Sequence, residues 1–168
     1  MIDDTTPTVE ALPTNPRLAL FLDQLSKLPG PGIVWCHFNH DVDAVVAGAR
    51  AAGKRVVQYD GRVTASAKAE AVALFQGGQA DLFVAKPRSA GRGHDLARAD
   101  WVLYYSHGWS LRMRQQSEDR AQSLKKTSAV SYLDVVCVDS IDARIVTALR
   151  SGKQLSDQIT GDAIAEWI

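Results

Sequence analysis

The chain has 168 residues, with 19 basic and 19 acidic side chains, so its formal net charge at pH 7 is zero. This length suits a single domain that can bury a substantial core, and the neutral total excludes a global field that would attract nucleic acid. No apolar run approaches about 18 residues, so no membrane-spanning helix is expected.

Residues 1–15 are acidic and rich in proline and threonine, and they lack the basic start and apolar run of a signal peptide. We therefore expect a flexible tail over residues 1–15 and a single domain over residues 16–168. Cys36 and Cys137 each lie in an apolar, strand-like run. This predicts two buried free thiols rather than a disulfide, which fits a cytoplasmic protein.

Helix-like and strand-like segments alternate after residue 15, by their hydrophobic spacing and their turn residues. Helices are predicted over residues 16–28, 40–52, 64–76, 110–124 and 139–151, with one or two short helices in the tail that follows. Thr64 and Asp139 are the expected N-cap residues of the third and fifth helices. Strands are predicted over residues 32–38, 55–60, 81–86, 101–106 and 129–138.

Five apolar strands separated by helices predict an α/β domain of three layers. A mostly parallel sheet of five to six strands would be covered by helices on both faces. Ligands of such sheets bind in loops at the carboxyl ends of the strands. The candidate loops are therefore 37–41, 60–64, 86–96 and 106–110.

Loop 86–96, "KPRSAGRGHDL", begins a locally basic stretch, because residues 86–126 carry nine basic and four acidic side chains. One interpretation is a connector whose glycines permit tight turns. The other is a phosphate contact, in which Lys86, Arg88 and Ser89 meet a nucleic-acid backbone and Asp95 meets sugar hydroxyls. Composition leaves both interpretations open.

The segment "RQQSEDRAQSL" places Gln116 and Arg120 four residues apart, hence on one face of the predicted helix. A solvated surface balanced by Glu118 and Asp119 is the ordinary interpretation. The functional one is an arginine aimed at a nucleotide γ-phosphate. His37 and His40 have no second ligand cluster at metal-site spacing, so no metal site is expected.

Five segments carry a resemblance to a known family. They are "GIVWCHFNHDVDAVV", "VVQYDGRVTASAKAEAVALFQGG", "LFVAKPRSAGRGHDLARADWVLYY", "QQSEDRAQSL" and "VSYLDVVCVDSIDARIVTALRSGKQLSDQITGD". In this order and spacing they resemble the second, C-terminal RecA-like lobe of superfamily-two helicases, most of all that of Swi/Snf-type DNA translocases of phage and bacterial type. The first, third and fourth segments look like motifs IV, V and VI. The resemblance covers residues 16–168.

The resemblance implies a RecA-like fold and roles for the matching positions. Motif VI implies that Gln116 and Arg120 are catalytic and bind nucleotide, and motif V adds Gly93 and Asp95 to the nucleotide site. The nucleic-acid side would comprise the matching positions of motifs IV and V and the Gly61 turn, together with two basic residues of loop 86–96: His37, Asn39, Arg62, Lys86, Arg88, Ser89, Ala90 and Gly91.

Two departures from the family limit the activity that is expected. Gly-Lys pairs occur only at Gly53-Lys54 and Gly152-Lys153, and neither is followed by serine or threonine, so these 168 residues hold no Walker A phosphate loop. We expect no cofactor and no ATPase activity from the chain alone, and ATP and Mg²⁺ only when a first lobe supplies their site. Ser123 occupies the position of motif VI's second arginine, whose loss can cost about 10³–10⁵ in rate.

Three functions are compatible with these observations. The chain is either the second lobe of a DNA helicase or translocase, or a non-catalytic module that binds nucleic acid or protein as a scaffold or as a decoy of a complete helicase. An unrelated nucleotide or sugar-phosphate enzyme on the same fold is the third. The expected partners are DNA, with RNA as the alternative, and a first RecA-like lobe or a helicase-associated protein.

Overall fold

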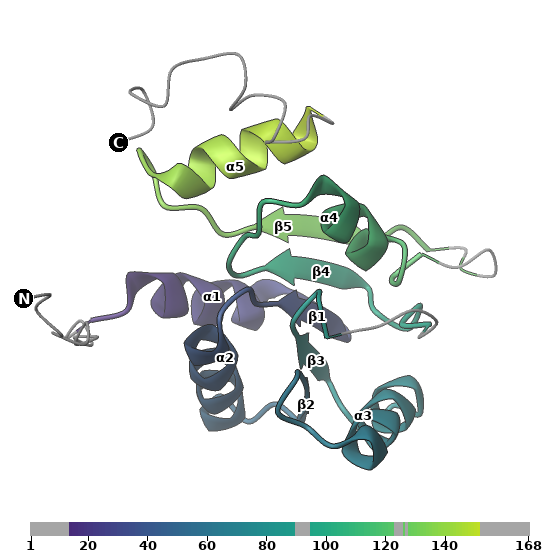
Figure 1. The fold of residues 1–168 in the computed structure, drawn as a ribbon. Helices are drawn as coiled ribbons and strands as arrows, with labels where there is room; N and C mark the ends of the chain where they lie inside the picture. Colours follow the sequence, from purple (N-terminus) through teal and green to yellow (C-terminus); the bar gives the residue numbers. More distant parts are fainter. Residues whose placement is uncertain (1–13, 90–94, 123–125, 127, 152–168) are drawn as a thin grey trace, which may run out of the picture.

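A computed structural model describes residues 14–89, 95–122, 126 and 128–151. Five strands form one parallel sheet in the order β2-β3-β1-β4-β5 (Figure 1). They are β1 (Gly32–Trp35), β2 (Val56–Tyr59), β3 (Leu82–Ala85), β4 (Trp101–Tyr104) and β5 (Ser131–Asp134). The five predicted strands are all present, and each is shorter than predicted because its flanking residues belong to loops.

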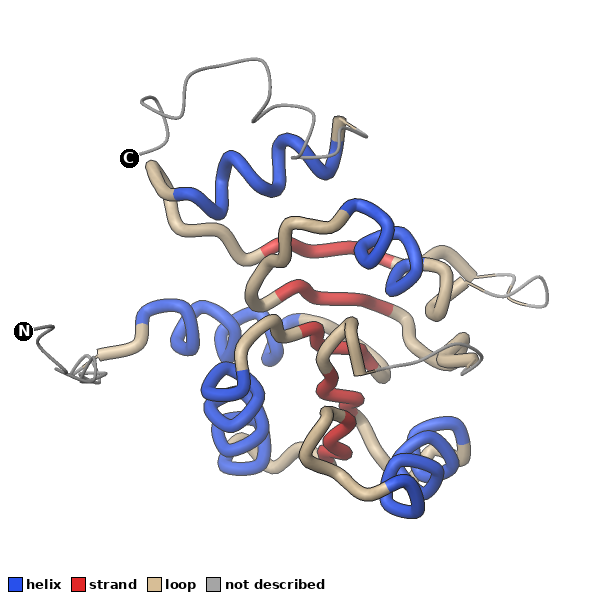
Figure 2. The backbone as a smooth tube through the Cα atoms, viewed as in Figure 1, coloured by secondary structure: helices blue, strands red, loops and turns tan. Residues whose placement is uncertain are grey.

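Helices pack on both faces of this sheet, and Figure 2 shows them in blue around the red strands. They are α1 (Pro16–Lys27), α2 (Asn39–Ala51), α3 (Ala65–Gln76), α4 (Leu111–Glu118) and α5 (Ile141–Arg150). This arrangement confirms the predicted α/β fold. The helices expected after residue 151 lie outside the described residues.

The two faces of the sheet carry separate cores because successive strand side chains point to opposite sides. On one face Val34 packs with Phe21 of α1 and Val42 of α2. On the other face Ile33 packs with Phe75 of α3. All five side chains are fully buried, and each such burial contributes about 1.5–3 kcal/mol. The central strand β1 therefore anchors both layers.

Helix α5 lies beyond strand β5 and closes that end of the domain (Figure 1). Its buried Ile145 and Leu149 pack with Leu111 of α4. An ion pair between Arg17 and Asp142 joins α5 to α1. The helix is thus held by a small apolar cluster and by charges, not by the main core.

The predicted N-cap of the fifth helix and the predicted end of the fourth are wrong, whereas the predicted cap of the third is confirmed. Thr64 caps α3 as predicted, since its hydroxyl accepts from the Ala67 N–H at 3.3 Å. The N-cap of α5 is Ser140 rather than Asp139, which adopts a positive φ of 55°. Helix α4 ends at Glu118, six residues before the predicted end, because the chain turns to bring Ala121 into the core.

The prediction of two buried thiols is correct for Cys36 and wrong for Cys137. Both are free, but Cys36 is buried and Cys137 is exposed. Strand β5 ends at Asp134, so the apolar run "VVCV" leaves the sheet after the buried Val135. Among the described helices, none is long and apolar enough to cross a membrane.

Candidate functional site

The candidate loops meet at one edge of the sheet because the strands are parallel and end in register. Trp35 of β1 pairs with Ala85 of β3 and with Tyr104 of β4. Tyr59 of β2 also pairs with Ala85. The loops that follow these four strands therefore start side by side, as the sequence predicts for the carboxyl edge.

Two of the residues predicted to contact nucleic acid are joined directly. Lys86, after β3, donates from Nζ to Oδ1 of Asn39, the first residue of α2, at 2.9 Å. Arg88 follows in the same turn and is exposed, while the Ser89 N–H donates to the Lys86 carbonyl at 3.0 Å. The structure thus brings the start of loop 86–96 against the loop after β1.

His37, in the loop after β1, contacts the loop after β4. Its N–H donates to Ser106 Oγ at 2.7 Å. A Cβ atom at Gly108 would come within 2.8 Å of the His37 Nδ1 atom, so a larger residue there would force the imidazole ring to move. Partial burial lowers the pKa of His37, and the charges of Lys86 and Arg88 lower it further. The neutral form of the ring is therefore favoured at pH 7.

Arg62 is held by two carboxylates. Its guanidinium donates to both oxygens of Asp43, at 2.9 and 2.8 Å, and to Asp60 Oδ2 at 2.6 Å. Asp60 is fully buried; burial would raise its pKa, but the hydrogen bonds from Arg62 lower it overall. Loop 60–64 is thereby fixed to α2, and a nucleic-acid contact of Arg62 stays a prediction.

Two of the residues predicted to face a nucleotide, Asp95 and Arg120, lie on neighbouring segments of the chain. The Asp95 carboxylate accepts from the Ala97 N–H at 2.8 Å. The Leu96 N–H donates to the Arg120 carbonyl at 2.9 Å, so the ends of loop 86–96 and of α4 are adjacent. Gln116 is exposed on α4.

The expectation that Gln116 and Arg120 share one helix face is wrong, because α4 ends at Glu118 and Arg120 lies in the turn beyond it. Burial lowers the pKa of Arg120, and Tyr59 partly offsets this. The remaining predicted positions, Ala90, Gly91 and Gly93, lie outside the described residues, as does Ser123.

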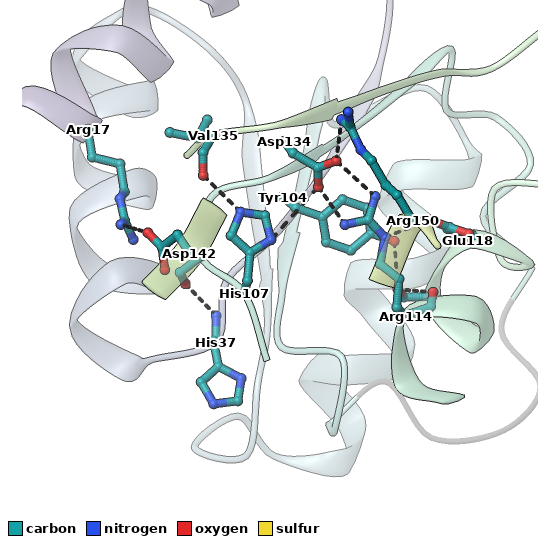
Figure 3. A network of polar contacts seen from close by, with 12 residues as sticks. Arg17, His37, Tyr104, His107, Arg114, Glu118, Asp134, Val135, Asp142 and Arg150 are labelled. Carbon is teal, nitrogen blue, oxygen red and sulfur yellow. Dashed lines mark hydrogen bonds and ion pairs between the residues drawn. The ribbon is translucent and has the colours of Figure 1, made fainter. Parts of the chain in front are cut away.

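A buried charge that the sequence did not indicate lies at the end of β5. Only 2% of the Asp134 side chain is exposed. Its carboxylate accepts hydrogen bonds from Arg114 of α4 and from Arg150 of α5 (Figure 3). His107, from the loop after β4, brings Nδ1 to 3.8 Å from the same carboxylate. Helices α4 and α5 therefore share one buried anion, and the loop after β4 approaches it.

Arg114 has a second set of partners besides Asp134. Its Nε donates to Glu118 at 2.6 Å, one turn along α4. Its guanidinium also lies over the Tyr104 ring, 3.4 Å from the centroid, an attraction that strengthens when the pair is desolvated. The spacing of Arg114 and Glu118 was the one sequence signal of this cluster. The contact with Asp134 required the tertiary structure.

The electrostatics of this cluster favour an ionised aspartate and a neutral histidine. Burial alone would raise the pKa of Asp134, but the hydrogen bond and charge of Arg114 hold it below its usual value. Burial lowers the pKa of His107. Its Nε2 lies 2.8 Å from the Val135 carbonyl, which only accepts, so Nε2 carries the proton. Its buried Nδ1 has no hydrogen-bond partner in the described part of the chain.

A cavity of about 410 Å³ lies between loop 86–88, the loop after β4 and helix α4. His37, Arg88, Trp109 and Met113 are among the residues that line it. Within residues 14–89, 95–122, 126 and 128–151, no group of three or more His, Cys, Asp or Glu side chains is placed to hold a metal ion.

Comparison with known proteins gives the family. Residues 17–125 match the helicase conserved C-terminal domain. The chain belongs to this family. This helicase C-terminal domain is 33% identical over 107 residues to the chromatin-remodeling ATPase INO80 of Drosophila melanogaster, covering 62% of this chain and 6% of that protein. It is 27% identical over 163 residues to the ATP-dependent helicase brm of the same organism, covering 95% of this chain and 9% of that protein.

Solved structures share the fold of this helicase C-terminal domain. The C-terminal part of the Fun30 ATPase domain has a TM-score of 0.71 at 16% identity and covers 78% of this chain and 44% of that one. The S. cerevisiae Dbp5 C-terminal domain bound to Gle1 and IP6 has a TM-score of 0.67 at 12% identity, covering 82% and 78%. The resemblance to the C-terminal lobe of Snf2-family ATPases of superfamily two is confirmed. The chain spans less than a tenth of the length of the INO80 and brm proteins of Drosophila melanogaster.

Proposed function

We propose that this domain acts as the second lobe of an ATP-dependent DNA helicase or translocase. It would contact nucleic acid through the loops after β1 and β3, and it would complete a nucleotide site held by a first lobe. The observation that carries the proposal is the hydrogen bond between Lys86 and Asn39, which unites the two loops at the carboxyl edge of the sheet. A cation held there, with exposed Arg88 beside it, suits the phosphates of a nucleic-acid backbone.

The nucleotide side of the proposal depends on the turns that carry Asp95 and Arg120, which are joined through the Leu96 N–H. Together with exposed Gln116, they form the part of the edge that would close over a nucleotide. The first lobe would supply the ATP phosphate loop and Mg²⁺, whose electrostatic stabilisation drives phosphoryl transfer. This domain would contribute the positive charge of Arg120 and hydrogen-bond donors on the side of the nucleotide that faces away from the first lobe.

A non-catalytic module is the second candidate function. Ser123 stands where motif VI of the family has its second arginine, and serine cannot stabilise transferring charge as a guanidinium does. A neighbour of the same fold, the C-terminal domain of Dbp5, has been solved bound to the protein Gle1. These observations favour a scaffold or decoy. The phage or bacterial type and the cytoplasmic location stay predictions from the sequence.

Hydrolysis in mixtures separates the two functions. The purified domain is mixed with first lobes of superfamily-two helicases, and DNA-stimulated ATP hydrolysis is measured. If the domain is a second lobe, it should hydrolyse no ATP alone, and at least one mixture should hydrolyse ATP. Arg120→Ala should lower the hydrolysis rate of that mixture by at least tenfold. If the domain binds DNA but no mixture hydrolyses ATP, the second-lobe function is refuted and the module is favoured.

Binding at several salt concentrations tests the nucleic-acid contact. Arg88→Ala and Lys86→Ala should each weaken DNA binding and reduce the slope of log affinity against log salt by about 1. Arg55→Ala is the matched control, because Arg55 precedes β2 at the opposite edge of the sheet and pairs with Asp81. Salt-independent binding, or equal effects of all three substitutions, would contradict the proposed contact.

A further inference from the structure

Lys126, in the chain that follows helix α4, has an ammonium group inside the domain. Only 9% of its side chain is exposed. Its Nζ donates to the main-chain carbonyl of Ala97 at 2.9 Å and to that of Ala99, and it lies 3.8 Å from Asp100 Oδ1. Lysine is rarely buried without partners, because taking an ammonium out of water is costly. These three oxygens therefore form a specific anchor point for Lys126.

The turn that Lys126 binds, residues 96–99, directly follows Asp95 of the proposed nucleotide site. The Leu96 N–H at its start donates to the Arg120 carbonyl at 2.9 Å. The chain after α4 therefore contacts this turn at two points, first through the main chain of Arg120 and then through the side chain of Lys126. Both contacts hold the segment of Arg120 against the segment of Asp95.

The same turn is fixed to α3 by a different side chain. The Arg98 guanidinium donates to the carbonyls of Phe75 and Ala80, at 3.1 and 2.8 Å. It also lies over the Phe75 ring, 5.5 Å from the centroid, and Phe75 is fully buried in the core. The turn thus stays attached to the core without Lys126. Loss of Lys126 should therefore release the chain after α4 and leave the sheet intact.

The contacts of Lys126 also decide what kind of role it can have. Ser123 stands where motif VI of the family has its second arginine, and Lys126 is a cation only three residues further on. An ammonium has three N–H donors, and here it binds two main-chain carbonyls within the domain. It is therefore engaged by the turn and does not replace the arginine at a phosphate.

We propose that Lys126 is a positioning residue of the nucleotide side of this domain, which sets the place of Arg120 relative to Asp95 by binding the carbonyls of turn 96–99. The proposal rests on the second-lobe function proposed above and adds to it a residue that does not touch the nucleotide. Precise placement of such groups matters, because a displacement of about 1 Å can cost about 100-fold in rate.

Hydrogen exchange of the Leu96 amide, followed by NMR in the domain alone, tests the placement. Lys126→Met keeps the length of the side chain and removes its donors. The Leu96 amide should then exchange about 10- to 150-fold faster, because two hydrogen bonds from a charged group no longer hold the turn. Amides of the buried strand β1 should keep their rates. Lys126→Arg, which retains charge and donors, should keep most of the protection at Leu96.

Lys27→Met is the matched control. Lys27 is 61% exposed and pairs with Asp23 on the surface of α1, so its loss should not change exchange at Leu96. An unchanged Leu96 rate in Lys126→Met refutes the proposal. A rise that is equal at Leu96 and throughout β1 also refutes it, because Lys126 would then stabilise the whole fold. Equal losses in Lys126→Met and Lys126→Arg refute the part played by the donated bonds.

ATP hydrolysis in mixtures with first lobes tests the consequence for the site. Lys126→Met should lower the rate of an active mixture by up to about 100-fold, and Lys126→Arg should restore most of it. In the Arg120→Ala background Lys126→Met should have little further effect, because it acts through the placement of Arg120. Full multiplication of the two effects refutes this.

The two assays distinguish failure of this proposal from failure of the second-lobe function. If no mixture hydrolyses ATP, the second-lobe function is refuted, and with it any role of Lys126 at a nucleotide. Faster exchange confined to the Leu96 region in Lys126→Met would still establish that Lys126 places the turn. If mixtures hydrolyse ATP and Lys126→Met changes neither the rate nor the exchange, only the positioning role is refuted.

Discussion

Replacing Asp134 with asparagine tests whether one buried anion holds α4 and α5 to the sheet. Asparagine keeps the shape of the side chain and removes its charge. Arg114, whose side chain is only 11% exposed, then keeps Glu118 as its one carboxylate partner among those described. Arg150 loses the same partner, but its side chain is 66% exposed and can be solvated by water.

The expected loss of stability is about 3 kcal/mol. Removing one partner from a buried ion pair costs about 3–5 kcal/mol, because the other charge stays buried and unpaired. The lower end applies here, since Arg114 retains the bond to Glu118 and the face of Tyr104. Arg150→Ala is the matched control and should cost at most about 1 kcal/mol, as exposed ion pairs do.

Urea denaturation followed by circular dichroism measures both values. With a slope of about 1–3 kcal/mol per molar urea, a loss of about 3 kcal/mol lowers the midpoint by about 1–3 M. If Asp134→Asn costs no more than Arg150→Ala, the reasoning is refuted, because the buried partner would then matter no more than the exposed one.

The direction of the pKa shift of Asp134 predicts how the stability lost in Asp134→Asn depends on pH. Burial would raise the pKa of Asp134, but Arg114 and the neighbouring cations lower it below the unfolded value of about 3.9. A carboxyl group whose pKa is lower in the folded state contributes its full stabilisation at pH values above its pKa in the unfolded state. This contribution is lost as the pH falls through the pKa of the group in the folded state. The stability difference between the unaltered protein and Asp134→Asn should therefore be constant near neutrality and shrink below about pH 4.

The remaining predictions concern single contacts. Gly108→Ala should destabilise the fold by about 1–3 kcal/mol in thermal denaturation, because the new Cβ would meet His37 at 2.8 Å; an unchanged melting temperature would contradict this close approach. Thr64→Ala should cost about 1 kcal/mol through loss of the α3 cap, and Thr64→Ser should restore most of it. Native thiol titration should find one fast cysteine, exposed Cys137, and one slow cysteine, Cys36, whose pKa burial raises; Cys137→Ser should remove the fast phase.

The sequence predicted the fold well wherever a local pattern decides the structure. Each of the five strands follows from an apolar run, and the cap at Thr64 follows from residue type. The predictions failed where tertiary packing overrides the pattern. Helix α4 stops early because Ala121 turns into the core, and Cys137 is exposed because the sheet ends before it.

The contact of Arg114 with Asp134 could not be found from the sequence for a different reason. The two residues are 20 positions apart on different elements, and charges of opposite sign occur throughout this chain. Only the placement of β5 beside β4, with α4 packed over them, brings this arginine and this aspartate together. Local spacing carries no information about such a pair, whereas the Lys86 and Asn39 contact could be expected, since both residues follow strands that end at the same edge.

The segment between β3 and β4 connects the two halves of the candidate site. At its start Lys86 is bonded to Asn39 on the proposed nucleic-acid side, and near its end the Leu96 N–H is bonded to the Arg120 carbonyl on the proposed nucleotide side. Each end of this segment is therefore fixed to a neighbouring loop by a hydrogen bond. The second link uses the main chain of Arg120, so Arg120→Ala removes the guanidinium and leaves the connection in place. Arg120→Ala therefore tests the charge that Arg120 would contribute to a nucleotide site without disturbing its structural role. Lys86→Ala cannot separate the two in the same way, because it removes both the charge of Lys86 and its hydrogen bond to Asn39.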